Sequence, residues 1–373
     1  MMNLRDLQRK RRFLSQLALG LGGVSLGAIL GKASAAQVCA VPGEEMPQRR
    51  VWMTWPTNAV LWRKSLPQLQ NEPASLARTI AKYQPLSMIS DTEENAKNAL
   101  DKIGSTRYPV TMINSIPNDD FWLRDNGPIF RKSAGGALDC IDLNFNGWGG
   151  KQIAQKDTQV AQKIAAHLGI PITKAGIVGE GGGILQDGEG TLIATESCWV
   201  NDNRNPGKSR DQIEAELLRL FGAQKMIWCK GIRGGDITDM HIDASIQFVA
   251  PGKLLMHRPP ELANDIWAQE ARAMHKIMSA STDANGRKFE ITLIDEPVKL
   301  RSKNPQILRF YINYLAVNGA IISVNFGDEK NDASAKETFQ KLYPGRVIEM
   351  LELDHLYAGG GGIHCVTQQQ PLA

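Results

Sequence analysis

The stretch QKMIWCKGIRGGDITDMHIDASIQFV, residues 224–249, contains the unit from which the rest of the chain is built. An apolar run leads into a glycine-rich turn, and polar residues and a second apolar run follow. Short apolar runs bounded by glycines are typical of buried strands. Comparable stretches begin at Lys174 and Arg346, and looser versions begin at Val110 and Phe310. The sequence therefore indicates about five repeats of one supersecondary unit.

Amphipathic segments between these units predict helices. Alternating strands and helices, with no low-complexity linker, imply one α/β domain whose repeats are arranged radially. The glycine turns of such repeats would converge on one axis and bring distant polar residues together. The helices are expected from the N-cap Ser209 to Phe221 near Gly222, from about Asp157 to Leu168 before Gly169, and at 261–278 and 333–342.

Residues 1–35 differ from the rest of the chain. A basic head precedes an apolar stretch of 14 residues, Leu17 to Leu30, and the small residues Ala33-Ser34-Ala35 follow. This order predicts a cleaved export signal that is too short to span a bilayer comfortably. Arg11-Arg12 followed by Phe-Leu resembles a twin-arginine (Tat) signal, and a plain Sec signal is the alternative. We therefore expect residues 36–373 to form a single periplasmic domain, exported by Tat or Sec machinery and without a stable membrane anchor.

The positive net charge of +4 is concentrated in the same segment. Residues 1–35 hold six of the 43 Lys and Arg and one of the 39 Asp and Glu, so the remaining chain has a net charge of −1. This balance leaves no footprint for nucleic acid. In an exported protein an odd number of cysteines leaves at least one thiol unpaired, and the sequence does not determine how the others pair. The five cysteines are Cys39, Cys140, Cys198, Cys229 and Cys365.

Cys365 is the candidate nucleophile. It lies in GGGGIHCVTQQQP, residues 359–371, where the glycines leave room for a ligand to approach the thiol. Cys140, Cys198 and Cys229 are expected to be small buried hydrophobic residues. A thiol needs an electropositive partner to ionise at neutral pH. His364 is a poor partner if this segment is a strand, because successive side chains then point to opposite faces; a structural role is expected for it.

A better acid–base group is His241, in DITDMHID. On a strand, His241 and Asp243 would project to the same face, as would Asp239 if the strand begins early enough. A His-x-Asp pair could instead be half of a metal site. The other histidines are scattered, however, and no Cys-x-x-Cys pair occurs, so we expect neither a metal nor another cofactor.

The string NDDFWLRDNGPIF, residues 118–130, surrounds two aromatic residues with acids. Acids and Asn before Gly-Pro are common in turns, but carboxylates beside a ring also suit a planar cation. Asp125 and Asp243, from different repeats, could hold both edges of a guanidinium. Cys365 could then attack the guanidinium carbon while His241 protonates the leaving ammonia. The same histidine would activate water to hydrolyse the covalent thiouronium, and the product would be a urea.

Several longer strings resemble one known family. Over roughly residues 45–371 the chain is similar to agmatine deiminases and Porphyromonas-type peptidylarginine deiminases, within the guanidine-modifying pentein superfamily. The resemblance implies a five-bladed α/β propeller with pseudo-fivefold repeats. The strings are WMTWP at 52–56, FWLRDNGPIF at 121–130, GEGG at 179–182, DGEGTLIATESCWVNDNRNP at 187–206, DITDMHID at 236–243, YIN at 311–313 and the glycine-rich string ending at Pro371.

The resemblance also assigns roles to individual residues. Cys365 matches the family nucleophile and His241 the general acid/base, with Asp125 and Asp243 as the guanidinium clamp. The predicted substrate-binding positions are Trp122, Glu180, Asp236 and Asn313. This chain departs from the family at 183–186 and at 324–328, and both departures affect contacts with the far end of the substrate.

The expected reaction is hydrolysis of agmatine to N-carbamoylputrescine and ammonia, a step of putrescine and polyamine biosynthesis. Deimination of peptidyl-arginine to citrulline is the alternative, and export favours it. Enzymes acting on C-terminal arginine need a cation for the substrate carboxylate. The stretch NFNGWGGK, residues 144–151, offers only Lys151, which favours a small amine substrate such as agmatine. Two further alternatives are a secreted cysteine amidase or peptidase, for which Asp125 and Asp243 would be dispensable, and a non-catalytic protein that binds cations.

Overall fold

The computed structural model describes residues 39–373, which belong to one compact unit. The predicted export signal lies outside the described residues. Within them, no helix combines the length and the apolar character needed to cross a bilayer.

The strands of this unit form five separate sheets of three or four strands. In spatial order these are β17 (Thr367–Pro371), β2 (Gln48–Thr54), β3 (Leu86–Ile89) and β4 (Val110–Ile113); β1 (Cys39–Ala40), β5 (Ile129–Ser133), β6 (Leu138–Asp142) and β7 (Ile172–Lys174); β8 (Ile184–Gln186), β9 (Thr191–Thr195) and β10 (Lys225–Cys229); β11 (Ile246–Ala250), β12 (Lys253–Arg258) and β13 (Glu290–Asp295); and β14 (Leu315–Val317), β15 (Ala320–Val324) and β16 (Val347–Leu351).

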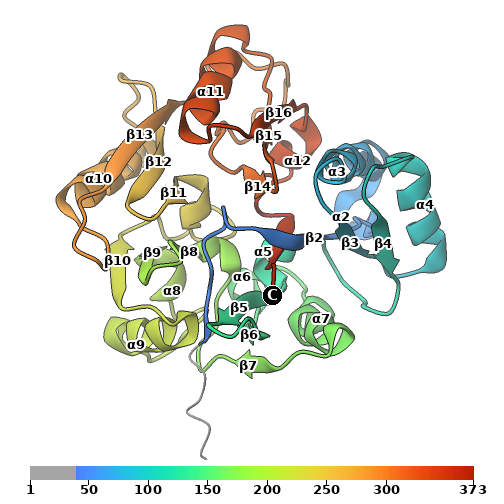
Figure 1. Cartoon of the computed structure of the whole chain (residues 1–373). Coiled ribbons are helices and arrows are strands. Elements are labelled where there is room, and N and C mark those ends of the chain that lie inside the picture. The colour runs from blue at the N-terminus through green and yellow to red at the C-terminus, as the bar shows by residue number, and fades with distance from the viewer. Residues whose placement is uncertain (1–38) are drawn as a thin grey trace, which may run out of the picture. The chain divides into compact units, whose positions relative to one another are not determined.

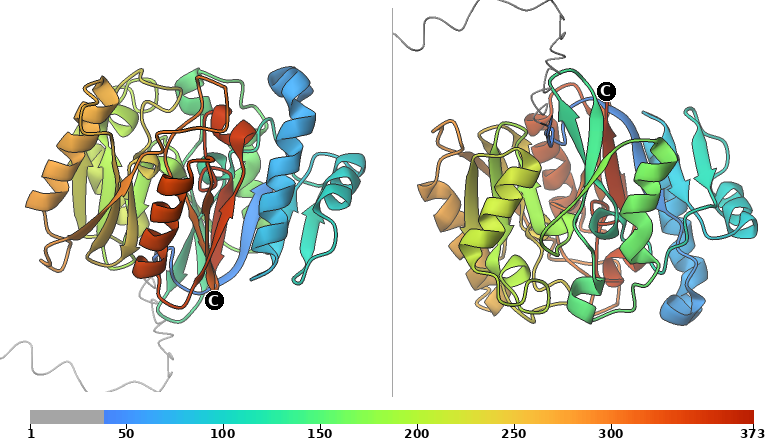
Figure 2. Two further views of the ribbon diagram at one scale, coloured as in Figure 1. Left: turned by 90° about the horizontal axis from the view of Figure 1, so that it is seen from above. Right: turned by 90° about the horizontal axis from the view of Figure 1, so that it is seen from below.

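Every sheet repeats one pairing pattern. A first strand pairs antiparallel with a second, and the second pairs parallel with a third after a helical crossover. Figure 1 shows α9, α10 and α11 on the outside of this unit and β8, β11 and β14 nearer its middle, and Figure 2 shows the helices alongside their own strands. The crossover helices are α3 (Leu66–Ile80), α4 (Glu93–Ile103), α7 (Val160–Leu168), α9 (Arg210–Phe221), α10 (Ile266–Ala280) and α11 (Glu329–Leu342).

The predicted mixed α/β fold is confirmed, and the repeat pattern explains why its apolar runs are short. The middle strands β3, β9 and β15 are buried along their whole length. A strand covered on both faces reads as a continuous apolar run rather than as an alternation. In the sheet that contains β2, the antiparallel partner is the last strand, β17, so segments from both ends of the described chain share one sheet.

The helix ends follow their capping residues. Ser209 forms a capping box with Gln212, and Gly222 ends α9 in the left-handed conformation, as predicted. Gly169 ends α7 in the same way, although a 3-10 turn, Asp157–Gln159, precedes that helix. Two predicted helix starts were wrong, because Asp265 and Asp328 cap α10 and α11. The short helices are α2 (Ala59–Trp62), α5 (Leu123–Asn126), α6 (Gly147–Gly150), α8 (Glu196–Trp199) and α12 (Asp354–Ala358).

Candidate active site

The candidate residues occupy equivalent positions in their repeats. Each lies just before the strand that begins the repeated pairing pattern in its sheet: β5, β8, β11, β14 or β17. Because these strands repeat one pairing pattern, the segments that precede them can supply side chains to a common site. The residues, in the order of those strands, are Asp125, Glu180, Asp243 with His241, Asn313 and Cys365.

Gly182 locates the point at which three of these side chains converge. A Cβ atom at Gly182 would lie 2.7 Å from His241 Nδ1, 2.9 Å from Asp125 Oδ1 and 3.1 Å from Asp243 Oδ2. These are closer than ordinary contacts, so only a glycine fits here without displacing its neighbours. The predicted gathering of Asp125, His241 and Asp243 is therefore confirmed by the geometry.

The two carboxylates of the predicted clamp have different environments. Asp125 accepts hydrogen bonds from the Gly182 amide (3.1 Å) and from Trp148 Nε1 (2.9 Å), and burial raises the pKa of Asp125 to about 6. Asp243 Oδ2 accepts from His364 Nδ1 at 2.8 Å, whereas the buried Oδ1 has no partner. Burial would raise the pKa of Asp243, but the hydrogen bond and charge of His364 hold it below its usual value. Asp243 is therefore an ionised carboxylate with one oxygen that accepts no hydrogen bond.

His241 lies between two acids. Its Nε2 is 3.3 Å from Glu180 Oε2, and its Nδ1 is 3.6 Å from Asp125 Oδ1. Burial alone would lower the pKa of His241, but these carboxylates raise it well above its usual value. The imidazole is therefore available as a proton donor at neutral pH.

Arg204 and Cys198 also hold the carboxylate of Glu180. Arg204 Nε donates to Glu180 Oε1 at 2.9 Å, and the Cys198 thiol lies 3.2 Å from Oε2. Arg204 also pairs with Asp239 Oδ2 at 2.6 Å, so this buried cation serves two acids. Cys198 is thus more than a small hydrophobic residue. Neither partner was predicted, although Arg204 lies within the quoted string that ends in Asn-Arg-Asn-Pro.

Cys365 lies beside the clamp. Its Sγ is 3.7 Å from Asp243 Oδ2 and 3.4 Å from Asn313 Oδ1. Burial and the charges of Asp243 and Asp125 raise the pKa of Cys365 well above its ordinary value. Without a bound cation, the sulfur is therefore held as a thiol.

Two stacked aromatic side chains, Phe121 and Trp122, lie next to the glycine-rich segment before Cys365. Trp122 stacks on Phe121 with ring centroids 4.7 Å apart, and its Nε1 donates to Asp120 Oδ2. A Cβ at Gly361 would lie 2.2 Å from the Trp122 ring, so the glycine-rich segment passes directly over the indole. The glycines thus permit close approach of the main chain, as the sequence suggested.

His364 with Cys365, and His241 with Asp243, were predicted to lie on strands, and both predictions were wrong. Residues 363–366 form a turn, so His364 and Cys365 both contact Asp243 instead of facing opposite ways. His241 is extended and is followed by a 3-10 turn, Ile242–Ala244, not by a strand. The turns nevertheless direct the side chains to one site.

Asn313, predicted to bind substrate, contacts three other residues of the site: His364, Cys365 and Asp243. Its Oδ1 accepts from the His364 amide at 2.9 Å and lies near the Cys365 thiol, while its Nδ2 lies 3.4 Å from the Asp243 carbonyl. The side chain is fully buried. Asn313 therefore connects the turn that carries Cys365 with the backbone of Asp243.

Asp236 and Asp239 are occupied elsewhere. Asp236 is exposed, and its Oδ1 accepts from Thr238 and Met240 within its own turn. Asp239 binds Lys151 Nζ at 2.7 Å in addition to Arg204. Lys151 is thus already paired, and no contact joins Asp236 to the residues around Gly182.

One group of described residues has the spacing of metal ligands. Glu180, Cys198 and His241 present atoms that lie within 4.8 Å of one another. The Arg204 guanidinium already donates to Glu180, and its fixed positive charge opposes a dication at that carboxylate. The donor set therefore fits an internal ion-pair cluster better than a metal centre.

The chain belongs to the Porphyromonas-type peptidyl-arginine deiminase family, whose sequence model matches residues 40–371. Among its relatives, the agmatine deiminases of Stutzerimonas stutzeri and Pseudomonas fluorescens are each 34% identical over 357 residues, covering 89% of this chain and 95% of theirs. The solved agmatine deiminase of Enterococcus faecalis superposes with a TM-score of 0.83 at 28% identity, covering 90% of this chain and 96% of that one.

Proposed function

We propose that this protein hydrolyses the guanidinium group of agmatine, giving N-carbamoylputrescine and ammonia. The observation that carries the proposal is the convergence of His241, Asp125 and Asp243 on one point beside the Cys365 thiol. Acids at the edges of a planar cation and a thiol near its carbon suit nucleophilic attack on a guanidinium. The names of the relatives point to the same reaction.

The first half-reaction forms a covalent intermediate. The Cys365 thiol loses its proton to solvent when the cation binds, and the thiolate adds to the guanidinium carbon. His241, as imidazolium, donates a proton to one amino group, and the carbon–nitrogen bond breaks to release ammonia. This leaves a thiouronium on Cys365 and a neutral His241.

The second half-reaction restores the enzyme. Neutral His241 takes a proton from water, and the hydroxide adds to the thiouronium carbon. The carbon–sulfur bond then breaks and releases the Cys365 thiolate, the hydroxyl proton passes through solvent to that thiolate, and the carbonyl of the urea product forms. Asp125 and Asp243 hold the amino groups in place throughout.

The free thiol is stabilised because acids surround it. A guanidinium between Asp125 and Asp243 would neutralise those charges and add its own positive charge next to the sulfur. Substrate binding would therefore generate the nucleophile, which protects the free enzyme from adventitious alkylation and oxidation.

The pairing of Lys151 favours a small amine substrate over C-terminal arginine. Its Nζ lies 2.7 Å from Asp239 and also donates to the Ile237 carbonyl, so the cation expected for a substrate carboxylate is already neutralised. Peptidyl-arginine remains the second candidate because of the family's name.

The proposal extends to architecture and location. The shared pairing pattern of the five sheets supports a five-bladed α/β propeller of the pentein type. Residues 1–35 are proposed to be a Tat-like export signal, so that residues 36–373 act as a single domain in the periplasm. This domain is proposed to need no cofactor and to bind no nucleic acid. Mass spectrometry of the N-terminus from the periplasmic fraction tests the proposed export; retention of residues 1–35 in the cytoplasm would contradict it.

The activity test uses purified residues 36–373 with agmatine, free arginine and an arginine-containing peptide. Ammonia and ureido product should form fastest with agmatine, and Cys365→Ala should bind agmatine without releasing ammonia. Faster turnover of the peptide would replace agmatine by the second candidate. Full activity of Asp125→Asn towards an amide substrate would instead favour a cysteine amidase.

A further inference from the structure

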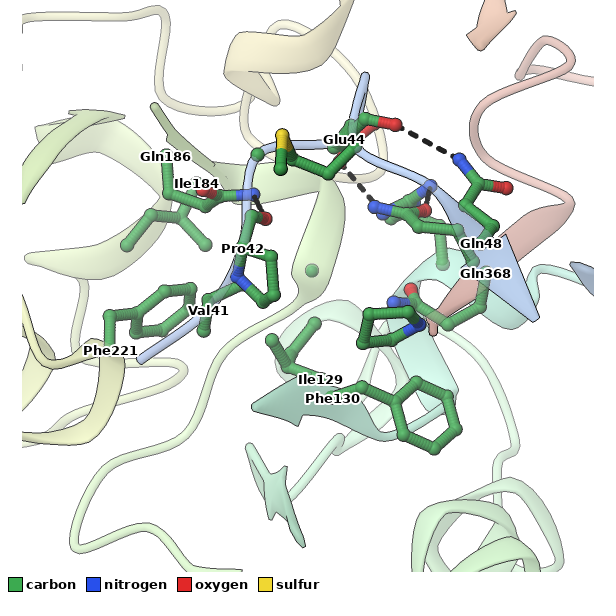
Figure 3. A pocket seen from close by; sticks show the side chains of 16 residues that line it. Val41, Pro42, Glu44, Gln48, Ile129, Phe130, Ile184, Gln186, Phe221 and Gln368 are labelled. Atoms are coloured by element: carbon green, nitrogen blue, oxygen red, sulfur yellow. Dashed lines mark hydrogen bonds and ion pairs between the residues drawn. The ribbon is translucent and has the colours of Figure 1, made fainter. Parts of the chain in front are cut away.

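The segment that leads into β2 contacts residues from several sheets. We call residues 41–48 the N-terminal strap. The Val41 amide donates to Phe221 O (3.2 Å), Gln186 Nε2 donates to Pro42 O (2.6 Å), and Gln48 Nε2 donates to Ala316 O (2.8 Å). Figure 3 shows Pro42, Glu44 and Gln48 along the strap, with Gln186 and Gln368 on either side. The strap is therefore held by contacts that do not involve the side chain of Glu44.

Glu44 reaches from the strap to two neighbours of the proposed active-site residues. Its Oε1 accepts from Arg124 Nη1 at 3.0 Å, and its Oε2 lies 2.9 Å from His364 Nε2. Arg124 directly precedes Asp125, and His364 directly precedes Cys365. The histidine side chain is fully buried, and that of Arg124 is 3% exposed.

His364 connects Glu44 with the clamp. Its second ring nitrogen, Nδ1, is 2.8 Å from Asp243 Oδ2. Both ring nitrogens thus face carboxylates, which is the arrangement of an imidazolium that donates two hydrogen bonds. The hydrogen bond to Oδ2 fixes the carboxylate of Asp243 beside Gly182 and Cys365, and it leaves Oδ1 as a buried oxygen without a partner.

We propose that Glu44 and His364 are positioning residues that keep Asp243 ionised and fix the orientation of its carboxylate beside Gly182 and Cys365. The inference rests on the proposed role of Asp243 as a clamp residue. It also makes the N-terminal strap a determinant of the chemistry.

Charge balance explains why Glu44 is needed. The charged groups facing His364 are Glu44 from the strap, Asp243 from the turn before β11, and Arg124 from α5. Arg124 repels a second cation, and the two carboxylates outweigh it. If Glu44 were neutral, Arg124 would remain beside an imidazole with only Asp243 to stabilise its charge. His364 would then lose its proton at lower pH, and Asp243 would be harder to ionise beside Asp125.

Glu44→Gln removes the charge while keeping the shape and one acceptor for Arg124. Glu45→Gln is the matched control, because Glu45 is the next residue of the strap and its side chain makes no hydrogen bond to Arg124, His364 or Asp243. The first measurement is nitrogen-15 NMR titration of the six histidines in labelled protein, with His364→Gln assigning the resonance. In Glu44→Gln, the midpoint for His364 should fall by about one pH unit or more, which is a tenfold change in its proton affinity.

The second measurement is the pH profile of ammonia release from agmatine. The acidic limb of kcat/KM should move to higher pH by about one unit in Glu44→Gln, so that kcat/KM falls by up to about tenfold at a fixed pH on that limb. Glu45→Gln should remain within about twofold of the parent in both measurements. Glu44→Gln with unchanged histidine titration and an unchanged pH profile would overturn the proposal, whether or not total activity fell.

The experiments distinguish failure of the proposed function from failure of the proposed role of Glu44. If the parent protein released no ammonia from agmatine, the proposed function would be wrong. The NMR titration would still decide whether Glu44 sets the protonation of His364.

Discussion

Gly182→Ala adds one methyl group at the point where the site residues converge. An ordinary contact begins near 3.4 Å, so His241 Nδ1 would have to move by about 0.7 Å and Asp125 Oδ1 by about 0.5 Å. Gly182 has no positive φ, so alanine introduces no backbone strain. Since displacing catalytic groups by about 1 Å can cost about 10²-fold in rate, we expect kcat to fall about 10- to 100-fold.

The cost to folding should be smaller. Overpacking a buried position typically costs about 1–3 kcal/mol, and the crowded atoms here lie at the ends of side chains. The assay combines steady-state ammonia release with urea denaturation at one pH. Gly176→Ala is the matched control, because this exposed glycine also lacks a positive φ and its added Cβ would contact only Glu216, at 3.3 Å. A folded Gly182→Ala protein with activity within about threefold of the parent would refute the convergence as the basis of catalysis.

Three further outcomes are expected. Arg204→Met leaves the carboxylates of Glu180 and Asp239 buried without their cation, so the free energy of unfolding in urea should fall by about 3–5 kcal/mol; a loss below about 1 kcal/mol would contradict this. Burial would raise the pKa of Asp239, but hydrogen bonds from Lys151, an amide and Arg204 lower it from 3.8 to about 2. Its folded-state pKa is the lower one, so its contribution to stability is present above about pH 4 and is lost as the pH falls towards 2; acid denaturation of Asp239→Asn should lack that component. Alkylation of Cys365 by iodoacetamide, followed by peptide mass spectrometry, should be slow at pH 7 and accelerate with rising pH; rapid labelling at pH 7 would show a preformed thiolate.

Local patterns predicted the parts of this structure that depend on neighbouring residues. The capping box at Ser209 and the left-handed glycines Gly169 and Gly222 were recognisable because each acts within one helix. The start of α11 was predicted four residues too late, because its first turn after the N-cap Asp328 is polar, and the start of α10 was predicted five residues too early, before its N-cap Asp265.

The site was predictable to the extent that its residues recur at equivalent places in the repeats. Asp125, His241, Asp243 and Cys365 each follow a recognisable turn, and the repeats bring those turns together. The strand periodicity used to orient His241 and His364 was the wrong argument, because both lie in turns. A period of two applies only where the backbone is extended over several residues.

No local sequence pattern indicated the ion pairs that support the site. Glu44 and His364 are 320 residues apart in the sequence, and their ion pair exists only in the folded chain. The pairing of Lys151 with Asp239 likewise depends on loops from two sheets. Such long-range pairs between isolated charges leave no spacing that a single sequence can reveal.

The antiparallel pairing of β17 with β2 has a consequence for biosynthesis. Trp52 meets Gln370 across 318 residues, so β2 has one unpaired edge until the final strand has left the ribosome. Contacts of this span form late, since the intervening chain must be ordered before they can close. The thiol is encoded two residues before the same final strand. A nascent chain that stops before residue 365 therefore has neither the closed sheet nor the predicted nucleophile.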